Sequence, residues 1–306
     1  MASMSGVVKQ SDSRLIELIA AQIGEGAQQM ACKQGPDFLR QRSIAQELTH
    51  AGQRAFWGAA VESDAQLLAQ GQLAVVEEYV PRLAQAVLDA VMKKHFPVVL
   101  GGDHSCAIAT WSAIAKAYQA QGELGLIWID AHLDSHSPDT SHSGAPHGMP
   151  LAVLLGHGPS ALTDLYHWRG KFKPENVVVV GVRSYEPAEA ELLKKLGVEI
   201  VSIEQVQKRS FASCLQEIIS KVSRHTIGYG ITFDLDALDP KDAPGVGSPV
   251  SNGMRLADTL EGLSLAAQDP HLVGFELVEY NPLLDDAAFT TAATCEALLK
   301  AVLHSR

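Results

Sequence analysis

The chain has 306 residues, of which 46% are hydrophobic and 19% charged, a composition typical of a globular protein. A chain of this size buries enough surface to fold without disulfides or a structural metal. Its net charge of −11 argues against nucleic-acid binding, which needs a basic surface, and is compatible with a cationic substrate.

The N-terminus, the apolar runs and the cysteines indicate the cellular location of the protein. No apolar run reaches the roughly 18 residues of a membrane span, and the N-terminus lacks the apolar stretch of a secretory signal. Residues 1–14 are predicted to be disordered, and residues 15–306 to form a single domain. The four cysteines are far apart and show no C-x-x-C pairing, which predicts free thiols in a reducing cytoplasm. Cys106 could instead be a nucleophile, but a packing role is favoured.

Short apolar runs alternate with longer amphipathic segments along the whole chain. The predicted strands are 15–24, 97–102, 124–130, 176–182, 198–203, 227–236 and 271–279. The predicted helices include 73–94, 187–197 and 211–223. This alternation predicts an α/β fold, with a parallel sheet covered by helices on both faces. We find no linker or repeat, so the pattern indicates one domain.

Ligands of open parallel sheets bind beyond the carboxyl ends of the strands, so the residues that follow each strand are the candidates. The first such segment, GEGAQQ at 24–29, begins like a phosphate-binding turn but lacks the third glycine. No P-loop pattern occurs either. Nucleotide binding is therefore not predicted.

The second segment, GGDHS, follows the strand predicted at 97–102. Asp103 or Ser105 could cap the helix that comes next, which would leave His104 as an exposed loop residue. Alternatively, His104 could be a ligand. The segment alone does not decide between these interpretations.

Two further strands end in alternating acidic side chains. Asp130, His132 and Asp134 are two residues apart, so in an extended segment they share one face. Asp234 and Asp236 have the same spacing at the end of the strand predicted at 227–236. Carboxylates at the end of buried strands are costly unless something neutralises their charge.

Four carboxylates and two neutral imidazoles would balance two divalent cations. Carboxylate oxygen with some imidazole suits manganese better than structural zinc. Two ions about 3.5–4 Å apart could share a bridging water and lower its pKa, which would produce hydroxide. The sequence therefore predicts a two-metal site at the carboxyl edge of the sheet.

Five motifs in order, GGDHS, DAHLD, HGMPLA, FDLDALDP and GFELVEYNP, resemble those of the ureohydrolase family, the binuclear manganese amidinohydrolases. Within this family the chain looks most like the arginases, which hydrolyse L-arginine to L-ornithine and urea. The resemblance implies a three-layer α/β/α sandwich with a mainly parallel sheet of about eight strands. It also implies two Mn²⁺ per subunit and a homotrimer or homohexamer.

The resemblance also implies which residues bind each ion. The ligands of one manganese would be His104, Asp130, Asp134 and Asp234. Those of the other would be His132, Asp130, Asp234 and Asp236, so that Asp130 and Asp234 bridge the ions.

Three residues acquire catalytic roles from the same resemblance. Glu279 would pair with the planar guanidinium and fix its carbon beside the bridging hydroxide. His147, in GAPHGMP, would move protons and protonate the leaving amine. Asp134 would take the proton of the attacking hydroxide. Glu276 has the wrong parity for this face of the strand and is left out.

The substrate tail would be recognised by the loop SHSPDTSHSGAP at 135–146, where arginases use small polar side chains. Here His136 replaces a usual asparagine, Ser143 agrees with the usual serine, and Ala145 replaces another asparagine. Ser141, His136 or a water molecule could compensate for the lost amide.

Two other positions would contact the tail. Glu186 occupies the place of an aspartate that contacts the α-ammonium group in arginases, and Ser248 that of a threonine. Because these positions differ, agmatine and guanidinobutyrate remain alternative substrates.

Two alternatives come from other functional classes. A metal-dependent deacetylase could use a D-x-H motif with one zinc, but it would not need Asp236 or a second histidine. A non-enzymatic relative would be expected to lose metal ligands, whereas all six positions are filled here. Counting bound metal ions would separate the deacetylase from the ureohydrolase.

Overall fold

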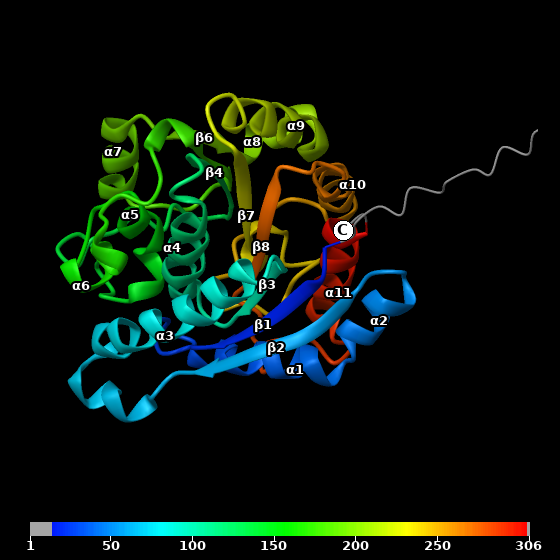
Figure 1. Ribbon diagram of the computed structural model, residues 1–306, viewed down its shortest axis with the longest axis horizontal. Helices are drawn as coiled ribbons and strands as arrows, with labels where there is room; N and C mark the ends of the chain where they lie inside the picture. The colour runs from blue at the N-terminus through cyan, green and yellow to red at the C-terminus, as the bar shows by residue number, and fades with distance from the viewer. Residues whose placement is uncertain (1–13, 305–306) are drawn as a thin grey trace, which may run out of the picture.

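The computed structural model describes residues 14–304, so the predicted disorder of 1–14 lies outside the described residues except at Arg14. Within this range the chain forms an eight-stranded, all-parallel sheet in the order β2-β1-β3-β8-β7-β4-β5-β6 (Figure 1). The strands are β1 Ile16–Gln22, β2 Ala55–Glu62, β3 Phe96–Gly101, β4 Leu124–Ile129, β5 Val177–Val182, β6 Glu199–Ser202, β7 Gly228–Asp234 and β8 Leu272–Val278.

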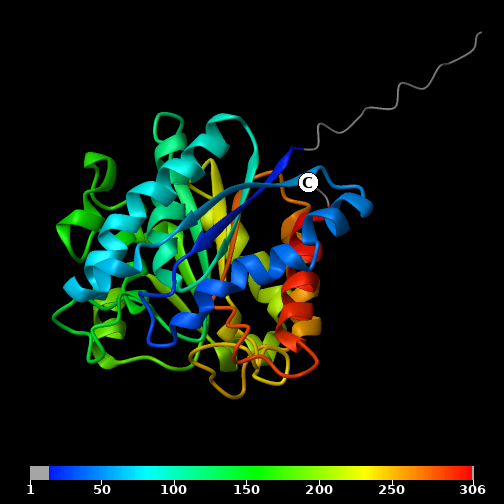
Figure 2. The same cartoon turned by 90° about the horizontal axis from the view of Figure 1, so that it is seen from below.

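Helices cover both faces of this sheet, which confirms the predicted three-layer α/β/α architecture (Figure 2). The α-helices are α1 Gly35–Gln41, α2 Ile44–His50, α3 Gln72–Met92, α4 Ala107–Tyr118, α5 Pro150–Leu154, α6 Ser160–Thr163, α7 Pro187–Leu196, α8 Ile203–Arg209, α9 Phe211–Val222, α10 Leu256–Ala267 and α11 Thr290–Leu303. Short 3₁₀ turns are η1 Met30–Gln34, η2 Ala65–Gln70, η3 His104–Cys106, η4 Pro146–Gly148, η5 Leu165–His167, η6 Pro174–Asn176 and η7 Leu235–Ala237.

Two hydrophobic cores lie on opposite faces of the sheet. Helices α3 to α7 pack on one face, and α1, α2 and α8 to α11 pack on the other. Alternate residues of β4 enter different cores: Leu126 and Trp128 contact the first set of helices, whereas Ile127 and Ile129 contact the second. Burial on both faces explains why the central strands are continuous apolar runs in the sequence.

The sequence pattern missed one strand and misplaced several strand ends by one or two residues; the strand predicted at 15–24, for example, covers only Ile16–Gln22. β2 is an edge strand with mostly half-buried side chains, so it lacks the apolar run that marks the other strands. The segment predicted as a strand at 124–130 ends at Ile129. The segment predicted at 227–236 ends at Asp234, because the Asp234 side chain accepts a hydrogen bond from Asp236 N and closes the turn η7.

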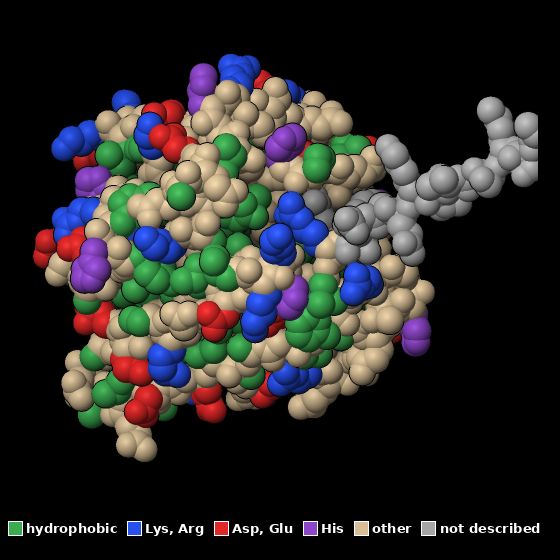
Figure 3. Space-filling view, viewed as in Figure 1, with side chains coloured by type: hydrophobic (Ala, Val, Ile, Leu, Met, Phe, Trp, Pro, Cys, Tyr) green, Lys and Arg blue, Asp and Glu red, His purple; other side chains and the backbone are tan. Residues whose placement is uncertain are grey.

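On the face in Figure 3, Lys and Arg side chains are interspersed with Asp, Glu and apolar side chains. Among residues 14–304, no helix has both the length and the apolar character needed to cross a membrane.

Candidate active site with two metal-binding clusters

Four neighbouring strands in the centre of the sheet, β3, β8, β7 and β4, carry the predicted site at their carboxyl ends. After β3, Asp103 caps the turn η3 and accepts a hydrogen bond from Ser105 N at 2.9 Å. This agrees with the predicted cap, but His104 is fully buried, so it is not an exposed loop residue. The turn η3 places the buried His104 side chain at the carboxyl end of β3.

The residue after β4, Asp130, is held by two donors from its own segment. Trp128 Nε1 donates to Asp130 Oδ2 at 2.9 Å, and His132 N donates to Asp130 Oδ1 at 2.7 Å. The Trp128 ring also stacks on the His104 ring, with centroids 4.3 Å apart. The segment then bends, and Asp134 has a positive φ of 43°. The side chains therefore converge through a strained bend rather than through strand alternation.

The first cluster surrounds His104 Nδ1. This nitrogen lies 3.2 Å from Asp130 Oδ2, 3.0 Å from Asp134 Oδ2 and 3.1 Å from Asp234 Oδ2. None of these contacts has hydrogen-bond geometry, and His104 Nδ1 is buried without a hydrogen bond to any described residue. An imidazole nitrogen that faces three carboxylates without bonding to them fits a cation placed between these groups.

The second cluster surrounds His132 Nδ1, which lies 3.0 Å from Asp236 Oδ2 and 3.5 Å from Asp130 Oδ1. Backbone groups orient its carboxylates, because Ala131 N donates to Asp236 Oδ1 at 3.2 Å. His104, Asp130 and Asp234 form one group with metal-binding spacing, and Asp130, His132 and Asp236 form another. Asp130 is common to both groups; the bridging roles of Asp130 and Asp234 stay predictions.

The charges of the clusters require neutralisation. Burial, followed by repulsion from Asp236 and Asp130, raises the pKa of Asp234 well above its usual value. Burial and the Asp130 charge raise the pKa of Asp134 to about 7. Burial lowers the pKa of His104, but the surrounding carboxylates outweigh this and raise it well above its usual value. In the absence of metal, the raised pKa values favour the protonated forms of Asp134, Asp234 and His104, and a divalent cation would replace those protons.

The third component of the site is an acid–imidazole pair beside the clusters. Glu279 follows β8 with a positive φ of 69°, and its Oε1 accepts a hydrogen bond from His104 N at 3.0 Å. His147 Nδ1 lies 3.0 Å from the same oxygen. Burial lowers the pKa of His147, but the hydrogen bond with Glu279 and nearby carboxylates raise it to about 9. Two of the three residues with predicted catalytic roles, Glu279 and His147, thus lie side by side, and the third, Asp134, belongs to the first cluster.

A cavity of about 290 Å³ opens onto these groups. Ten of the predicted residues line it: His132, Asp134, His136, Ser143, His147, Glu186, Asp234, Asp236, Ser248 and Glu279. His104 and Asp130 lie buried beneath it. Ser141 does not line it; its hydroxyl accepts a hydrogen bond from Gly144 N at 3.0 Å and shapes the loop.

His136 lines this cavity, is largely buried, and contacts acidic side chains. Its Nε2 is 3.3 Å from Glu189 Oε2 and 3.7 Å from Glu186 Oε2. Its Nδ1 lies 3.2 Å from Thr140 Oγ1. Glu189 also accepts from Ser135 N at 3.2 Å, so it connects the loop 135–146 to the first turn of α7.

The sequence reasoning missed several residues that line the cavity, which are Gln28, Gly148, Ser184, Tyr185 and Glu189. Glu189 lies one helical turn after Glu186, and the two form the capping box of α7, a pattern that is visible in the sequence. Gln28 belongs to GEGAQQ, the segment that was considered only as a phosphate-binding turn. That segment follows β1 at the same edge of the sheet.

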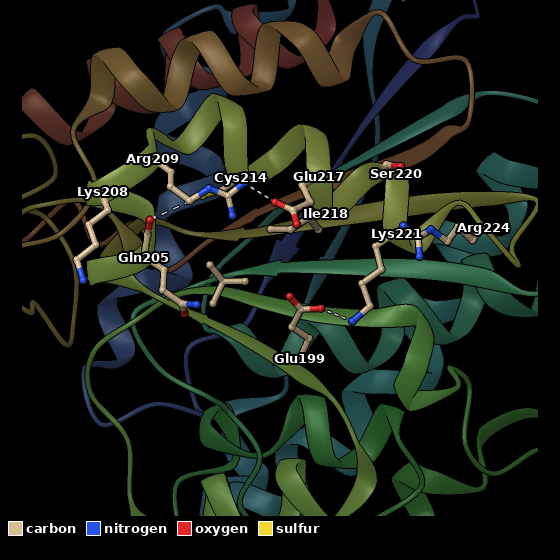
Figure 4. Close-up of a pocket in the computed structure, with 11 residues that line it drawn as sticks. Glu199, Gln205, Lys208, Arg209, Cys214, Glu217, Ile218, Ser220, Lys221 and Arg224 are labelled. Atoms are coloured by element: carbon tan, nitrogen blue, oxygen red, sulfur yellow. Dashed lines mark hydrogen bonds and ion pairs between the residues drawn. The ribbon is translucent and has the colours of Figure 1, made fainter.

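A larger cavity of about 480 Å³ lies beside the edge strand β6, between this strand and α8 and α9 (Figure 4). Arg209 pairs with Glu217 there, and Lys221 pairs with Glu199. None of the predicted site residues lines this cavity. The chemistry therefore belongs to the smaller cavity.

Comparison with known proteins agrees with this geometry. Residues 15–304 match the Arginase family. The chain is 40% identical over 227 residues to the arginase of Bacillus caldovelox, covering 74% of this chain and 75% of that protein. It is 38% identical over 225 residues to the arginase of Bacillus subtilis strain 168, covering 74% of each chain.

Solved structures show the same relationship. Arginase from Bacillus subtilis superposes with a TM-score of 0.88 at 33% identity, covering 95% of this chain and 98% of that one. A formiminoglutamase variant from Trypanosoma cruzi, at 20% identity and a TM-score of 0.77, shares the fold alone and covers 97% of this chain and 95% of that one. The match over nearly the whole sequence, together with two metal-binding clusters that share Asp130, shows that this chain belongs to the arginase family of ureohydrolases.

Proposed function

We propose that this enzyme hydrolyses L-arginine to L-ornithine and urea, with two Mn²⁺ ions per subunit. The observation that carries the proposal is the cavity itself. Both metal-binding clusters form its base, and the Glu279–His147 pair lies beside them. Among the described residues no Lys or Arg lines it, so its charge favours a cationic guanidinium group.

Manganese is favoured by the donor set, which is mostly carboxylate oxygen with two imidazoles. His104, Asp130, Asp134 and Asp234 would hold one ion. His132, Asp130, Asp234 and Asp236 would hold the other. When bound, the ions supply Lewis acidity and a water nucleophile at neutral pH.

The protein's own groups would position the substrate. Glu279 keeps Oε2 available while Oε1 is held by His104 N and His147, so the carboxylate can accept guanidinium N–H donors in a fixed orientation. This fixes the guanidinium carbon relative to the clusters. Because its pKa is raised to about 9, His147 is protonated at neutral pH, and it would donate this proton to the leaving amine. Asp134 would accept a proton from the nucleophile.

The tail of the substrate would be held at the outer part of the cavity. Ser143, Ser248, Glu186 and His136 all line the cavity and would supply its polar contacts. His136 belongs to the loop 135–146, and its ring faces Glu189 and Glu186. We propose that this ring replaces the missing amide and contacts the α-carboxylate. Glu186 would contact the α-ammonium group, which completes recognition of an amino acid rather than of a simple amine.

The location and assembly are also proposals. All four cysteines are buried free thiols in the described chain, which supports a reducing cytoplasm. We propose a homotrimer or homohexamer, as in the enzymes that the sequence resembles. Light scattering after size-exclusion chromatography would determine the mass of the assembly.

The test is urea release from Mn²⁺-loaded protein that is offered L-arginine, agmatine and guanidinobutyrate separately. We expect turnover of L-arginine and its loss in Asp130→Ala, which removes the carboxylate common to both clusters. His136→Ala should raise the KM for L-arginine, and exchange of the exposed His157 for alanine is its matched control, because His157 does not line the cavity. Preferred turnover of agmatine or guanidinobutyrate would overturn the substrate, and no urea with two ions bound would overturn the reaction.

A further inference from the structure

Glu276 is a buried carboxylate that the mechanism above does not use. It lies on β8, three residues before Glu279, and its side chain has no exposure to solvent. Its position in the side-chain alternation along β8 directs Glu276 away from the cavity, and Glu276 does not line that cavity. No Lys or Arg among the described residues forms an ion pair with it. Burial raises the pKa of Glu276, and a buried carboxyl group of this kind requires hydrogen-bond partners and a reason for being kept.

Three donors surround this carboxylate. Trp111 Nε1 donates to Glu276 Oε2 at 3.1 Å, and the Thr232 hydroxyl donates to the same oxygen at 2.7 Å. Cys106 Sγ donates to Glu276 Oε1 at 3.7 Å. An indole N–H can only donate, so Glu276 acts as an acceptor here.

The proton of Thr232 determines the state of His104. A threonine hydroxyl has one proton, and here it is directed to Glu276. The Thr232 oxygen lies 3.1 Å from His104 Nε2, so it can only accept a hydrogen bond from that nitrogen. The Nε2 atom of His104 must therefore carry a proton. In the neutral ring, Nδ1 is then the unprotonated nitrogen, and it faces Asp130, Asp134 and Asp234.

We propose that Glu276 is a positioning residue for the metal site, which acts through the Thr232 hydroxyl to hold His104 in the tautomer whose Nδ1 binds the ion. The Trp128 ring, which stacks on His104, fixes the plane of the imidazole, while Thr232 fixes its rotation and its proton. Partners of this kind commonly change metal affinity by about 10- to 100-fold when they are removed. The inference rests on the proposed metal site and adds the groups that prepare it.

The test compares two substitutions at Thr232 that separate the role of its hydroxyl from that of its methyl group. Thr232→Val keeps the shape but removes the hydroxyl, whereas Thr232→Ser keeps the hydroxyl and removes a methyl group. We expect Thr232→Val to raise the Mn²⁺ dissociation constant about 10- to 100-fold and Thr232→Ser to remain within about threefold of wild type. Thr259→Val is the control, because Thr259 is equally buried but lies on α10 and donates to Arg255 O.

Isothermal titration with Mn²⁺ gives the dissociation constants, and thermal unfolding of the metal-free proteins tests for a merely structural effect. The positioning role predicts that Thr232→Val loses affinity while its unfolding temperature stays close to that of Thr259→Val. Equal Mn²⁺ affinity in Thr232→Val and wild type would overturn the inference. So would equal losses of affinity in Thr232→Val and Thr232→Ser.

A double-mutant cycle tests the part played by Glu276. Glu276→Gln replaces a charge-assisted hydrogen bond by a weaker neutral one, so alone it should weaken Mn²⁺ binding about three- to tenfold. In a Thr232→Val background it should add nothing, because the connection is already broken. Effects that multiply, or no effect of Glu276→Gln alone, would contradict action through Thr232. If the wild-type protein bound no Mn²⁺, the proposed function itself would fail. This outcome differs from a failure of the positioning role, in which the wild-type protein binds Mn²⁺ but the substitutions do not change its affinity as expected.

Discussion

Gly26 offers a test of how the backbone positions His147. Its N–H donates to Asp103 Oδ2 at 2.8 Å, and its carbonyl accepts a hydrogen bond from His147 N at 3.0 Å. A Cβ added at this position would lie 2.5 Å from Asp103 Oδ1, which is short of ordinary van der Waals contact by about 1 Å. Asp103 is fully buried and held by Ser105, so it cannot simply rotate away.

Gly26→Ala should therefore move the Gly26 backbone, and His147 with it, by about 1 Å, a misplacement that can lower the rate about 100-fold. Urea release should show this loss in kcat, while Mn²⁺ binding stays near wild type because Gly26 contacts neither cluster directly. Gly148→Ala is the comparison variant. Gly148 follows His147 and lines the cavity, and its added Cβ would meet only His136 Cδ2 at an ordinary 3.7 Å, so this variant should change KM while kcat stays near wild type. The reasoning is refuted if Gly26→Ala keeps more than half of the activity, or if both variants lose it equally.

Three further predictions concern the site. Glu279→Gln should lower kcat/KM about 10²- to 10⁴-fold, since two charge-assisted hydrogen bonds to the guanidinium are weakened, and retained Mn²⁺ binding by titration would separate this effect from metal loss. Asp236→Asn should reduce the bound Mn²⁺ from two ions to one per chain, because Asp236 belongs to one cluster only; metal analysis that still finds two ions would contradict this. In the metal-free protein, burial lowers the pKa of His147, but its bond with Glu279 raises that pKa from 6.5 to about 9. The resulting stabilisation of the folded protein should be complete below about pH 6.5 and lost as the pH rises towards 9. The difference in unfolding temperature between wild type and His147→Asn should therefore narrow over this range. A difference that stays constant would contradict this prediction.

Much of the fold could be predicted because the central strands are buried on both faces. Such strands are short apolar runs bounded by polar residues, and these are visible in the sequence. The edge strand β2 was missed because half-buried side chains show neither an apolar run nor strict alternation. Its existence was implied only by the family resemblance.

The candidate site was predicted in its members but not in its geometry. Asp130, His132 and Asp134 were expected to converge by strand alternation, whereas the strand ends at Ile129 and a left-handed residue at Asp134 completes the convergence. Backbone conformations of this kind depend on tertiary contacts and leave no periodic signal.

Residues that act from outside the cavity were harder to predict. The parity argument was right that Glu276 does not face the cavity. It could not reveal that Thr232, on the neighbouring strand β7, lies between Glu276 and His104. Such connections follow from the order of strands in the sheet, which the sequence pattern leaves open.

That strand order has a consequence for how the protein is made. Among residues 14–304, β8 is the last strand to be synthesised, yet it inserts between β3 and β7, so that Val98 pairs with Phe275. Until β8 is available, the growing chain has two half-sheets with unpaired inner edges, which is a state that chaperones would have to protect. Pairing across such a separation in sequence makes this insertion a slow step. Because Glu279 directly follows β8, nascent chains cannot form the complete active site, and manganese loading would report the end of folding rather than guide its beginning.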